Sequence, residues 1–215
     1  MTGLRVDLRF VEIPYELWVL RQHLRVLEPQ IDGLRTQYRT ELEEWRRSKD
    51  WDPECDHEME SEVEDLSRDV LPRLLRHSFI VSTWAVYEGG VFEIAQYLAK
   101  HRGARLKLKD IRAEGFLAQA QLYFDSVLTL PLDPDHERLR ALDTLLKVRN
   151  AIAHGHGRKG VVKASTWDTL EKMATAGDGV AISHGYIIVG PELTRELFVA
   201  VDESLTDLMA RSKGN

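Results

Sequence analysis

The sequence predicts an all-α protein, an antiparallel helical bundle with one small β-hairpin before the C-terminal helix. Apolar residues recur at spacings of three and four over several long stretches, which is the pattern of amphipathic helices. Short apolar runs around a two-residue turn occur in only one segment, "GVAISHGYIIVG". Proline or glycine stands near several points where a helical pattern begins or ends.

Length and composition indicate one folded domain. The chain has 215 residues, of which 43% are hydrophobic and 30% charged, as in ordinary globular proteins. This length suits a single domain over residues 1–215. We expect a long helix or helices over residues 1–50 and a core bundle over residues 60–210.

Charge, cysteine content and hydropathy exclude several classes of protein. The net charge of −6 opposes a general nucleic-acid coat, so any contact with nucleic acid must be local. The single cysteine, Cys55, excludes an internal disulfide and fits a reducing compartment, so we expect a cytoplasmic protein. The N-terminus lacks a signal-peptide core, and the longest apolar run, residues 78–99, contains Glu88, Glu93 and two glycines. No membrane contact is therefore expected.

The N-terminal region predicts a long amphipathic helix. Its apolar stripe consists of Leu17, Leu20, Leu24, Leu27, Ile31, Leu34, Tyr38 and Trp45. Pro29 removes a backbone donor, so a kink or break is expected near Glu28. The stripe could form a coiled-coil dimer, but packing within the domain is the preferred interpretation.

An acidic segment follows, between Glu41 and Asp69, and predicts a solvated loop and the start of a helix. Counting from Asp52, His57 and Val63 stand where a calcium-binding EF-hand loop needs glycine and glutamate. Cys55 and His57 have no further zinc ligands nearby. We therefore expect no metal site in this segment.

The segment "LLRHSFIVSTWAVYEGGVFEIAQYLAKHRG" predicts a central helix with two apolar ridges. One ridge comprises Ile80, Trp84, Tyr87, Val91, Ile94 and Leu98, and the other Val81, Ala85, Glu88, Phe92, Ala95 and Ala99. Glu88 is the only polar member, and a carboxylate on a buried ridge needs a partner. Gly89 and Gly90 suggest a close approach between helices.

The remaining segments predict a succession of shorter elements. A helix is expected from about Asp110 to Leu128, and Pro134 opens the next helix. "GHGRKGVV" reads as a loop, followed by a short helix over about residues 167–174. His184 and Gly185 are expected at the turn of the hairpin, and Pro191 starts the last amphipathic helix.

The stretch "KVRNAIAHGHG", residues 147–157, is the candidate site. Arg149 projects from the apolar face defined by Leu142, Leu145, Leu146 and Ile152. His154 lies about 140° around an ideal helix from Arg149. The two side chains can therefore converge only if the helix ends or bends near His154, as the following glycines suggest.

Charge and residue type indicate an anion site around this stretch. No acid occurs from Thr144 to Trp167, while Lys147, Arg149, Arg158, Lys159 and Lys163 are present with two histidines. Histidine can move protons near neutral pH, and a fixed arginine can stabilise charge on a pentavalent phosphorus. Single-stranded RNA provides the phosphate and a 2′-hydroxyl nucleophile. The combination predicts metal-independent cleavage to a 2′,3′-cyclic phosphate and a 5′-hydroxyl.

These residues resemble the HEPN superfamily, whose motif is an arginine, often followed by a polar residue, with a histidine four to six residues after the arginine. Arg149, Asn150 and His154 match this motif, and "FIVSTWAVYEGGVFEIAQYLA" looks like the family's preceding core helix. The resemblance implies a HEPN-like bundle and a metal-independent, cofactor-free ribonuclease whose two protomers share one cleft. It also implies a toxin or phage-defence role, with RNA as substrate, a homodimeric state and an antitoxin as a further partner.

The residues then take the following expected roles. Catalysis is assigned to Arg149, Asn150 and His154, support to Glu88 and His156, and substrate binding to Lys147, Arg158 and Lys159. His156 stands where members regulated by adenylylation carry a tyrosine, which argues against that regulation and leaves either histidine as the proton carrier. A pairing of Glu88 with Arg149 would orient the arginine.

Two other interpretations stay open. A non-catalytic module could bind nucleotide, RNA or protein through the same cleft. A metal-dependent hydrolase could use His154 and His156, with His184 as a third ligand. By contrast, the glycines of "GHGRKG" follow a helix instead of a strand, so they do not indicate a dinucleotide-binding loop.

Overall fold

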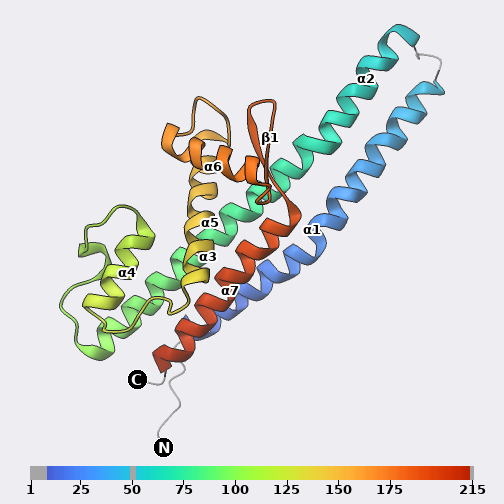
Figure 1. The fold of residues 1–215 in the computed structure, drawn as a ribbon. Coiled ribbons are helices and arrows are strands. Elements are labelled where there is room, and N and C mark those ends of the chain that lie inside the picture. Colours follow the sequence, from blue (N-terminus) through green and yellow to red (C-terminus); the bar gives the residue numbers. More distant parts are fainter. Residues whose placement is uncertain (1–8, 49–51, 214–215) are drawn as a thin grey trace, which may run out of the picture. The chain divides into compact units, whose positions relative to one another are not determined.

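The computed structural model describes residues 9–48 and 52–213. It is mainly helical with one antiparallel hairpin before the C-terminal helix, which confirms the predicted fold class (Figure 1). The elements are α1 (Arg9–Arg46), α2 (Pro53–Asp65), a π-helical turn η1 (Leu66–Val70), α3 (Leu71–Arg102), a 3-10 turn η2 (Leu108–Asp110), α4 (Phe116–Ser126), α5 (His136–Gly155), α6 (Ala164–Ala176), β1 (Val180–Ser183), β2 (Tyr186–Val189) and α7 (Pro191–Lys213).

The chain forms two compact units, each built from separate stretches of sequence. The first unit comprises residues 1–21, 80–150 and 195–215, and the second comprises residues 22–79 and 151–194. Helices α1, α3, α5 and α7 each contribute residues to both units. The expectation of a single domain over residues 1–215 stays a prediction.

The core of the first unit is built on one ridge of α3. Ile80, Trp84, Tyr87, Val91, Ile94 and Leu98 are all at most 2% exposed, as expected. The second expected ridge is not core, because Ala85 and Phe92 are exposed and only Ala95 is buried in this set. This face is therefore only partly covered: Phe92, Ala95 and Ala99 line a pocket together with Leu108 and Tyr123.

Gly90 allows helices of the first unit to approach closely. A Cβ at this buried position would lie 2.9 Å from Leu205 on α7 and 3.6 Å from Ile13 on α1. Gly89 has no atom within 4 Å of the corresponding position. The expectation of close packing is thus confirmed for Gly90 and wrong for Gly89.

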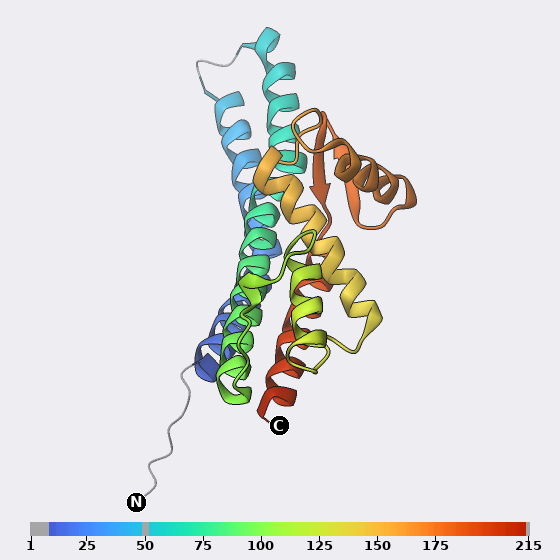
Figure 2. The ribbon, with the colours of Figure 1, turned by 90° about the vertical axis from the view of Figure 1, so that its left-hand side faces the viewer.

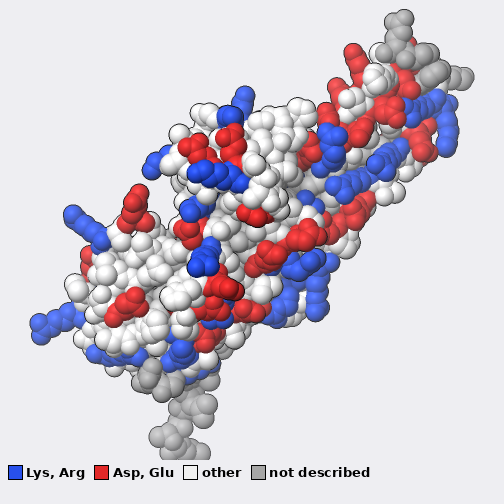
Figure 3. Space-filling view, viewed as in Figure 1, with Lys and Arg blue, Asp and Glu red and all other residues white. Residues whose placement is uncertain are grey.

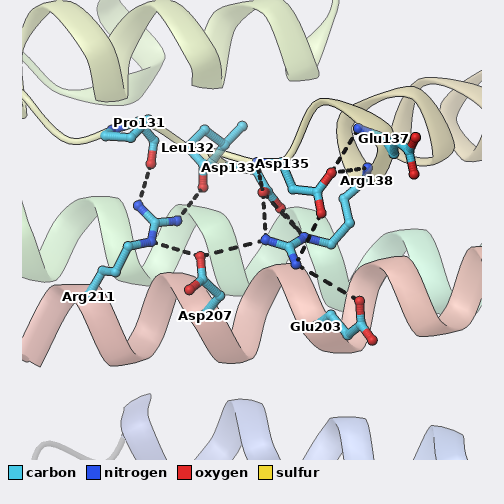
Figure 4. A network of polar contacts seen from close by, with 9 residues as sticks. All are labelled: Pro131, Leu132, Asp133, Asp135, Glu137, Arg138, Glu203, Asp207 and Arg211. Atoms are coloured by element: carbon cyan, nitrogen blue, oxygen red, sulfur yellow. Dashed lines mark hydrogen bonds and ion pairs between the residues drawn. The ribbon is translucent and has the colours of Figure 1, made fainter.

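A polar network in the first unit joins the segment before α5 to α7 (Figure 4). Arg138 donates three hydrogen bonds to Asp133, whose side chain is fully buried, and Arg211 donates to Asp207 and to the backbone before Asp133. Burial alone would raise the pKa of Asp133, but hydrogen bonds from Arg138 and from the Asp135 backbone N–H hold it below its ordinary value. Such a buried pair is costly to break because it leaves an unpaired charge.

Two helices begin later in the chain than the sequence predicts, α5 and α4. Asp135 accepts hydrogen bonds from the backbone N–H groups of Glu137 and Arg138, so the helix begins at His136 and not at Pro134. Likewise α4 begins at Phe116, after Gly115 with a φ of 88°, and not near Asp110. Leu108–Asp110 forms only a 3-10 turn.

In the second unit, the later part of α1 lies beside α2 and η1 (Figures 1 and 2). Arg35 Nε donates to the Ser67 carbonyl over 2.8 Å, and Arg46 pairs with Asp56 and Glu60 of α2. The acidic segment is therefore mostly helical, which corrects the expectation of a loop. Pairing with α1 arginines offsets part of the repulsion among its carboxylates.

Pro29 does not interrupt α1, which runs from Arg9 to Arg46 without a break. Leu27 and Ile31 on either side of it are fully buried in the second unit. Pro29 itself is exposed, so the carbonyl that loses its hydrogen-bond donor can be solvated. The expectation of packing within the chain is confirmed for these apolar residues, while the break was wrong.

The hairpin forms where the sequence predicts it. Val180 pairs with Val189 and Ser183 with Tyr186, and the two turn residues His184 and Gly185 have φ values of 49° and 76°. Positive φ at both positions is the hallmark of a type I′ turn. Helix α6 packs beside β1 within the same unit (Figures 1 and 2).

Candidate functional site

The candidate residues follow one another along α5 and the loop after it. Arg149 and Asn150 are the last α5 residues of the first unit, and His154 and His156 belong to the second. Helix α5 continues through His154 and ends at Gly155. On a continuous helix, residues five positions apart point about 140° away from each other. The bend that would bring Arg149 and His154 to one face of α5 does not occur before His154.

Arg149 is half-buried and only partly satisfied. Its Nη1 donates a hydrogen bond to Asn150 Oδ1 over 2.9 Å. Its Nε is buried and has no hydrogen-bond partner within the described part of the chain. A buried donor without an acceptor costs about 1–3 kcal/mol, which an anionic ligand could recover by accepting that bond.

Glu88 has a different partner from the expected one. Its carboxylate accepts a hydrogen bond of 2.7 Å from Trp84 Nε1, one helical turn earlier on α3. Among residues 9–48 and 52–213, no ion pair joins Glu88 to Arg149. Glu88 was expected to be buried on an apolar ridge. It is instead partly exposed, and the indole N–H of its own helix satisfies its carboxylate.

His154 and His156 are both exposed. No hydrogen bond or ion pair to the His154 ring occurs among the described residues, so no neighbouring side chain orients it. His156 has a φ of 49°, and its N–H donates to the Ile152 carbonyl at the end of α5. Both histidine rings are therefore accessible from solvent.

The loop after α5 is held against the hairpin of the second unit. Gly157 is buried with a φ of 67°, and its N–H bonds the Ala151 carbonyl. The Ile187 N–H donates to the Gly157 carbonyl over 2.9 Å, and Arg158 forms an isolated bridge with Tyr186. The loop is therefore a defined continuation of the hairpin edge and keeps the expected non-helical conformation.

The expected cations do not form an open basic surface. Lys147 pairs with Asp143 over 2.6 Å and Lys159 with Glu171 over 3.1 Å, both acids lying outside the acid-free stretch of sequence. Lys159, with help from Trp167, lowers the pKa of Glu171. On the face in Figure 3, acidic and basic side chains are interspersed. Arg158, near the Tyr186 ring at 6.0 Å, has no ion pair within the described chain.

His77 on α3 is a residue that the sequence did not single out. It is 6% exposed, and its Nε2 is buried without a hydrogen-bond partner among the described residues. Burial, assisted by the nearby Arg73, lowers the pKa of His77 to about 4, while a hydrogen bond to the Ile187 backbone acts in the opposite direction. In the sequence, His77 is recognisable only as a histidine near the start of an apolar helix. That position does not predict its contact with the hairpin.

The described residues contain neither a cluster of metal ligands nor a helix suited to span a membrane. Within residues 9–48 and 52–213, no group of three or more His, Cys, Asp or Glu side chains has the arrangement of a metal site. In the same part of the chain, no helix combines the length and apolar character that crossing a membrane requires.

Comparison with known protein families, with curated proteins and with solved structures gives no match to this chain. The resemblance to the HEPN superfamily therefore stays a prediction from Arg149, Asn150 and His154.

Proposed function

We propose that this protein is a metal-independent endoribonuclease of the cytoplasm, acting as a homodimer and serving as a toxin or phage-defence effector. The observation that carries the proposal is the state of Arg149, which is half-buried, bonded to Asn150 and left with one buried donor free. A guanidinium held in this way can bind a phosphate oxygen without first breaking an ion pair. Because one α5 helix points Arg149 and His154 in different directions, we place the site where two copies meet.

The proposed reaction is an internal transesterification. A histidine, His154 or His156, accepts the proton of the ribose 2′-hydroxyl, and that oxygen attacks the adjacent phosphorus. Arg149 stabilises the added negative charge on the phosphoryl oxygens, and Asn150 holds the guanidinium. The bond from phosphorus to the 5′-oxygen then breaks, and the leaving oxygen is protonated. The products are a 2′,3′-cyclic phosphate and a 5′-hydroxyl.

The proposal predicts cleavage of single-stranded RNA in EDTA by the purified protein. Arg149→Ala and His154→Ala should each reduce the rate by about 100-fold or more, the usual range for loss of an electrostatic or proton-transfer group. Arg140→Ala and His136→Ala, at exposed positions on the same helix, are the matched controls and should cleave at the wild-type rate. Intact RNA with wild-type protein, or equal rates for Arg149→Ala and wild type, would contradict the proposal.

The same assay assigns the proton carrier. His156→Asn is the suitable change at the second histidine because asparagine tolerates the positive φ at this position. Loss of cleavage in His154→Ala alone identifies His154, and loss in His156→Asn alone identifies His156. End-group analysis should detect the cyclic phosphate, and toxicity on expression should disappear in the inactive variant.

A non-catalytic binding module is the second candidate. Two observations favour it: no described residue orients the His154 ring, and Lys147 and Lys159 are already paired with acids. This candidate predicts that RNA or nucleotide binds in an Arg149-dependent manner and is recovered uncut. A cognate antitoxin would be a further partner only if the protein proves toxic.

A further inference from the structure

A pocket lies in the first unit, between the last turns of α3, the segment that follows α3, and α4 (Figure 1). Its volume is about 480 Å³, which is within the range of cavities that bind small ligands. All the residues that line it belong to the first unit. None of Arg149, Asn150 and His154 is among them, so the pocket is separate from the candidate ribonuclease residues.

Hydrogen bonds to α4 hold the segment between α3 and α4 in place around the pocket. Gln119 Nε2 donates to the Leu108 and Ile111 carbonyls over 3.1 and 2.7 Å. The Tyr123 hydroxyl donates to the Leu106 carbonyl over 3.0 Å. This wall of the pocket is therefore anchored without a ligand, and a preformed wall lowers the entropic cost of binding.

The base of the pocket is apolar. Phe92, Ala95 and Ala99 lie three and four residues apart on α3 and therefore share one face of the helix, while Leu108 comes from η2 and Tyr123 from α4. Ala95, Leu108 and Tyr123 are at most 4% exposed, whereas Phe92 is 37% exposed. Covering the exposed part of the Phe92 ring with an apolar ligand would remove that surface from water, which favours binding.

Three exposed lysines supply the charge of the pocket lining: Lys100, Lys107 and Lys109. None of them forms an ion pair with another described residue, and no acid lines the pocket. Lys100 also compensates the dipole at the end of α3, but Lys107 and Lys109 lie beyond that helix. In a chain with a net charge of −6, three unpaired cations around one apolar pocket favour a ligand of negative charge.

We propose that this pocket binds a small amphipathic anion. The apolar body of the ligand lies against Phe92 and the buried base, and its anionic head group lies among the three lysines. Apolar contact then supplies most of the affinity, and the lysines determine which end of the ligand faces solvent. The site does not depend on the proposed ribonuclease activity.

Three probes that divide the ligand into its parts test the proposal on the full chain by isothermal titration calorimetry. Octanoate has both a chain and a charge, octanol has the chain alone, and acetate has the charge alone. Octanoate should bind with a dissociation constant of about 1 mM or lower. Octanol should bind at least about threefold more weakly because it lacks the attraction to the lysines, and acetate should give no measurable binding.

Removal of the exposed ring tests the apolar base. Phe92→Ala should weaken the binding of octanoate and of octanol to a similar extent, by roughly fivefold, because both probes cover the ring with the same chain. Leu122→Ala truncates another exposed apolar side chain, on α4 outside the pocket, and should leave both affinities unchanged. Ala99→Leu narrows the pocket from α3 and should also weaken both probes. Circular dichroism verifies that each variant is folded.

Removal of charge tests the lysines separately. Lys107→Gln and Lys109→Gln should each weaken octanoate binding by about threefold and leave octanol binding unchanged, since only octanoate carries a charge. Lys172→Gln, at an exposed lysine on α6 in the second unit, is the matched control and should leave both affinities unchanged. Raising the salt concentration to about 0.5 M should weaken octanoate binding alone.

Absence of octanoate binding up to about 10 mM overturns the proposed site. So does octanoate binding that is equally strong in wild type, Phe92→Ala and Ala99→Leu, because the probe then lies elsewhere on the protein. Octanol that binds as tightly as octanoate, or lysine variants that match Lys172→Gln, would overturn the preference for an anion. Cleavage of RNA by these variants is a separate measurement and decides nothing about the pocket.

Discussion

At the residue scale, Arg149 and His77 each have a buried nitrogen without a hydrogen-bond partner among the described residues, but only one of them suits an anionic ligand. Arg149 keeps a permanent charge, and its free Nε lies on a side chain that is only half-buried. His77 is almost fully buried and is neutral at ordinary pH, because burial lowers its pKa to about 4. An anion can therefore bind the charged Arg149 directly, whereas its binding to His77 would first require protonation of the neutral ring. Arg149 is therefore the better candidate for substrate contact, and His77 contributes to stability.

His77 should make the protein less stable in mild acid. Below the ordinary histidine pKa of 6.5 the unfolded chain binds a proton that the folded chain does not bind until about pH 4. The stabilisation is thus present above pH 6.5 and is lost as the pH falls toward 4. Between pH 7 and pH 5 this amounts to about 2 kcal/mol. Urea unfolding at both values measures it.

His77→Gln removes the titrating ring, so its unfolding free energy should change less between pH 7 and pH 5 than that of the wild type. His57→Gln alters an exposed histidine on α2 and should keep the wild-type dependence. If His77→Gln and wild type lose the same stability on acidification, His77 is not the group responsible.

At the scale of elements, the loop after α5 is held against the hairpin at Gly157. Gly157 has a φ of 67°, and a Cβ there would lie 2.8 Å from Ile187 Cγ1 and 3.1 Å from His77 Cε1. Gly160 in the same loop has a φ of 84° with open space around the corresponding position. The pair therefore separates backbone strain from steric overlap with the hairpin.

Gly157→Ala should lower the free energy of unfolding by roughly 3 kcal/mol, since it combines strain at positive φ with overpacking. Gly160→Ala should cost only about 1 kcal/mol, because strain alone applies. Chemical denaturation of both variants gives the comparison. Equal losses would mean that contact with Ile187 does not position this loop.

At the scale of the whole molecule, continuity of the helices is the main organising feature. Four helices contribute residues to both compact units, so neither unit is a continuous piece of sequence. If one unit unfolded alone, each of these four helices would have to be interrupted at the boundary between the units. Helix formation is cooperative, so we expect the chain to unfold in one transition.

Local tryptophan fluorescence tests this expectation. Trp84 lies in the first unit and Trp167 in the second, and both are buried. Variants that keep only one of these two residues, with the remaining tryptophans replaced by phenylalanine, should give the same denaturation midpoint. Two separate midpoints would show that the units unfold independently and would contradict the single-domain prediction.

Apolar periodicity by itself determined the helical class, the hairpin and the last helix, because spacings of three and four and the His184–Gly185 turn are local properties of the chain. It could not decide which ridge of α3 is buried, since Ala85 and Phe92 suit either environment. Nor could it show that Pro29 leaves α1 unbroken, because that depends on the burial of Leu27 and Ile31.

For the candidate site, the sequence determined which residue types stand together on α5, and it predicted that a continuous helix would separate Arg149 from His154. Only the tertiary structure decided their partners. Lys159 pairs with Glu171, twelve residues away and on α6. The exposure of Trp18 on α1 likewise emerged only from the structure, since an exposed apolar side chain is indistinguishable in sequence from a core residue. Pairing and burial depend on what the folded chain places nearby, and that information is not local.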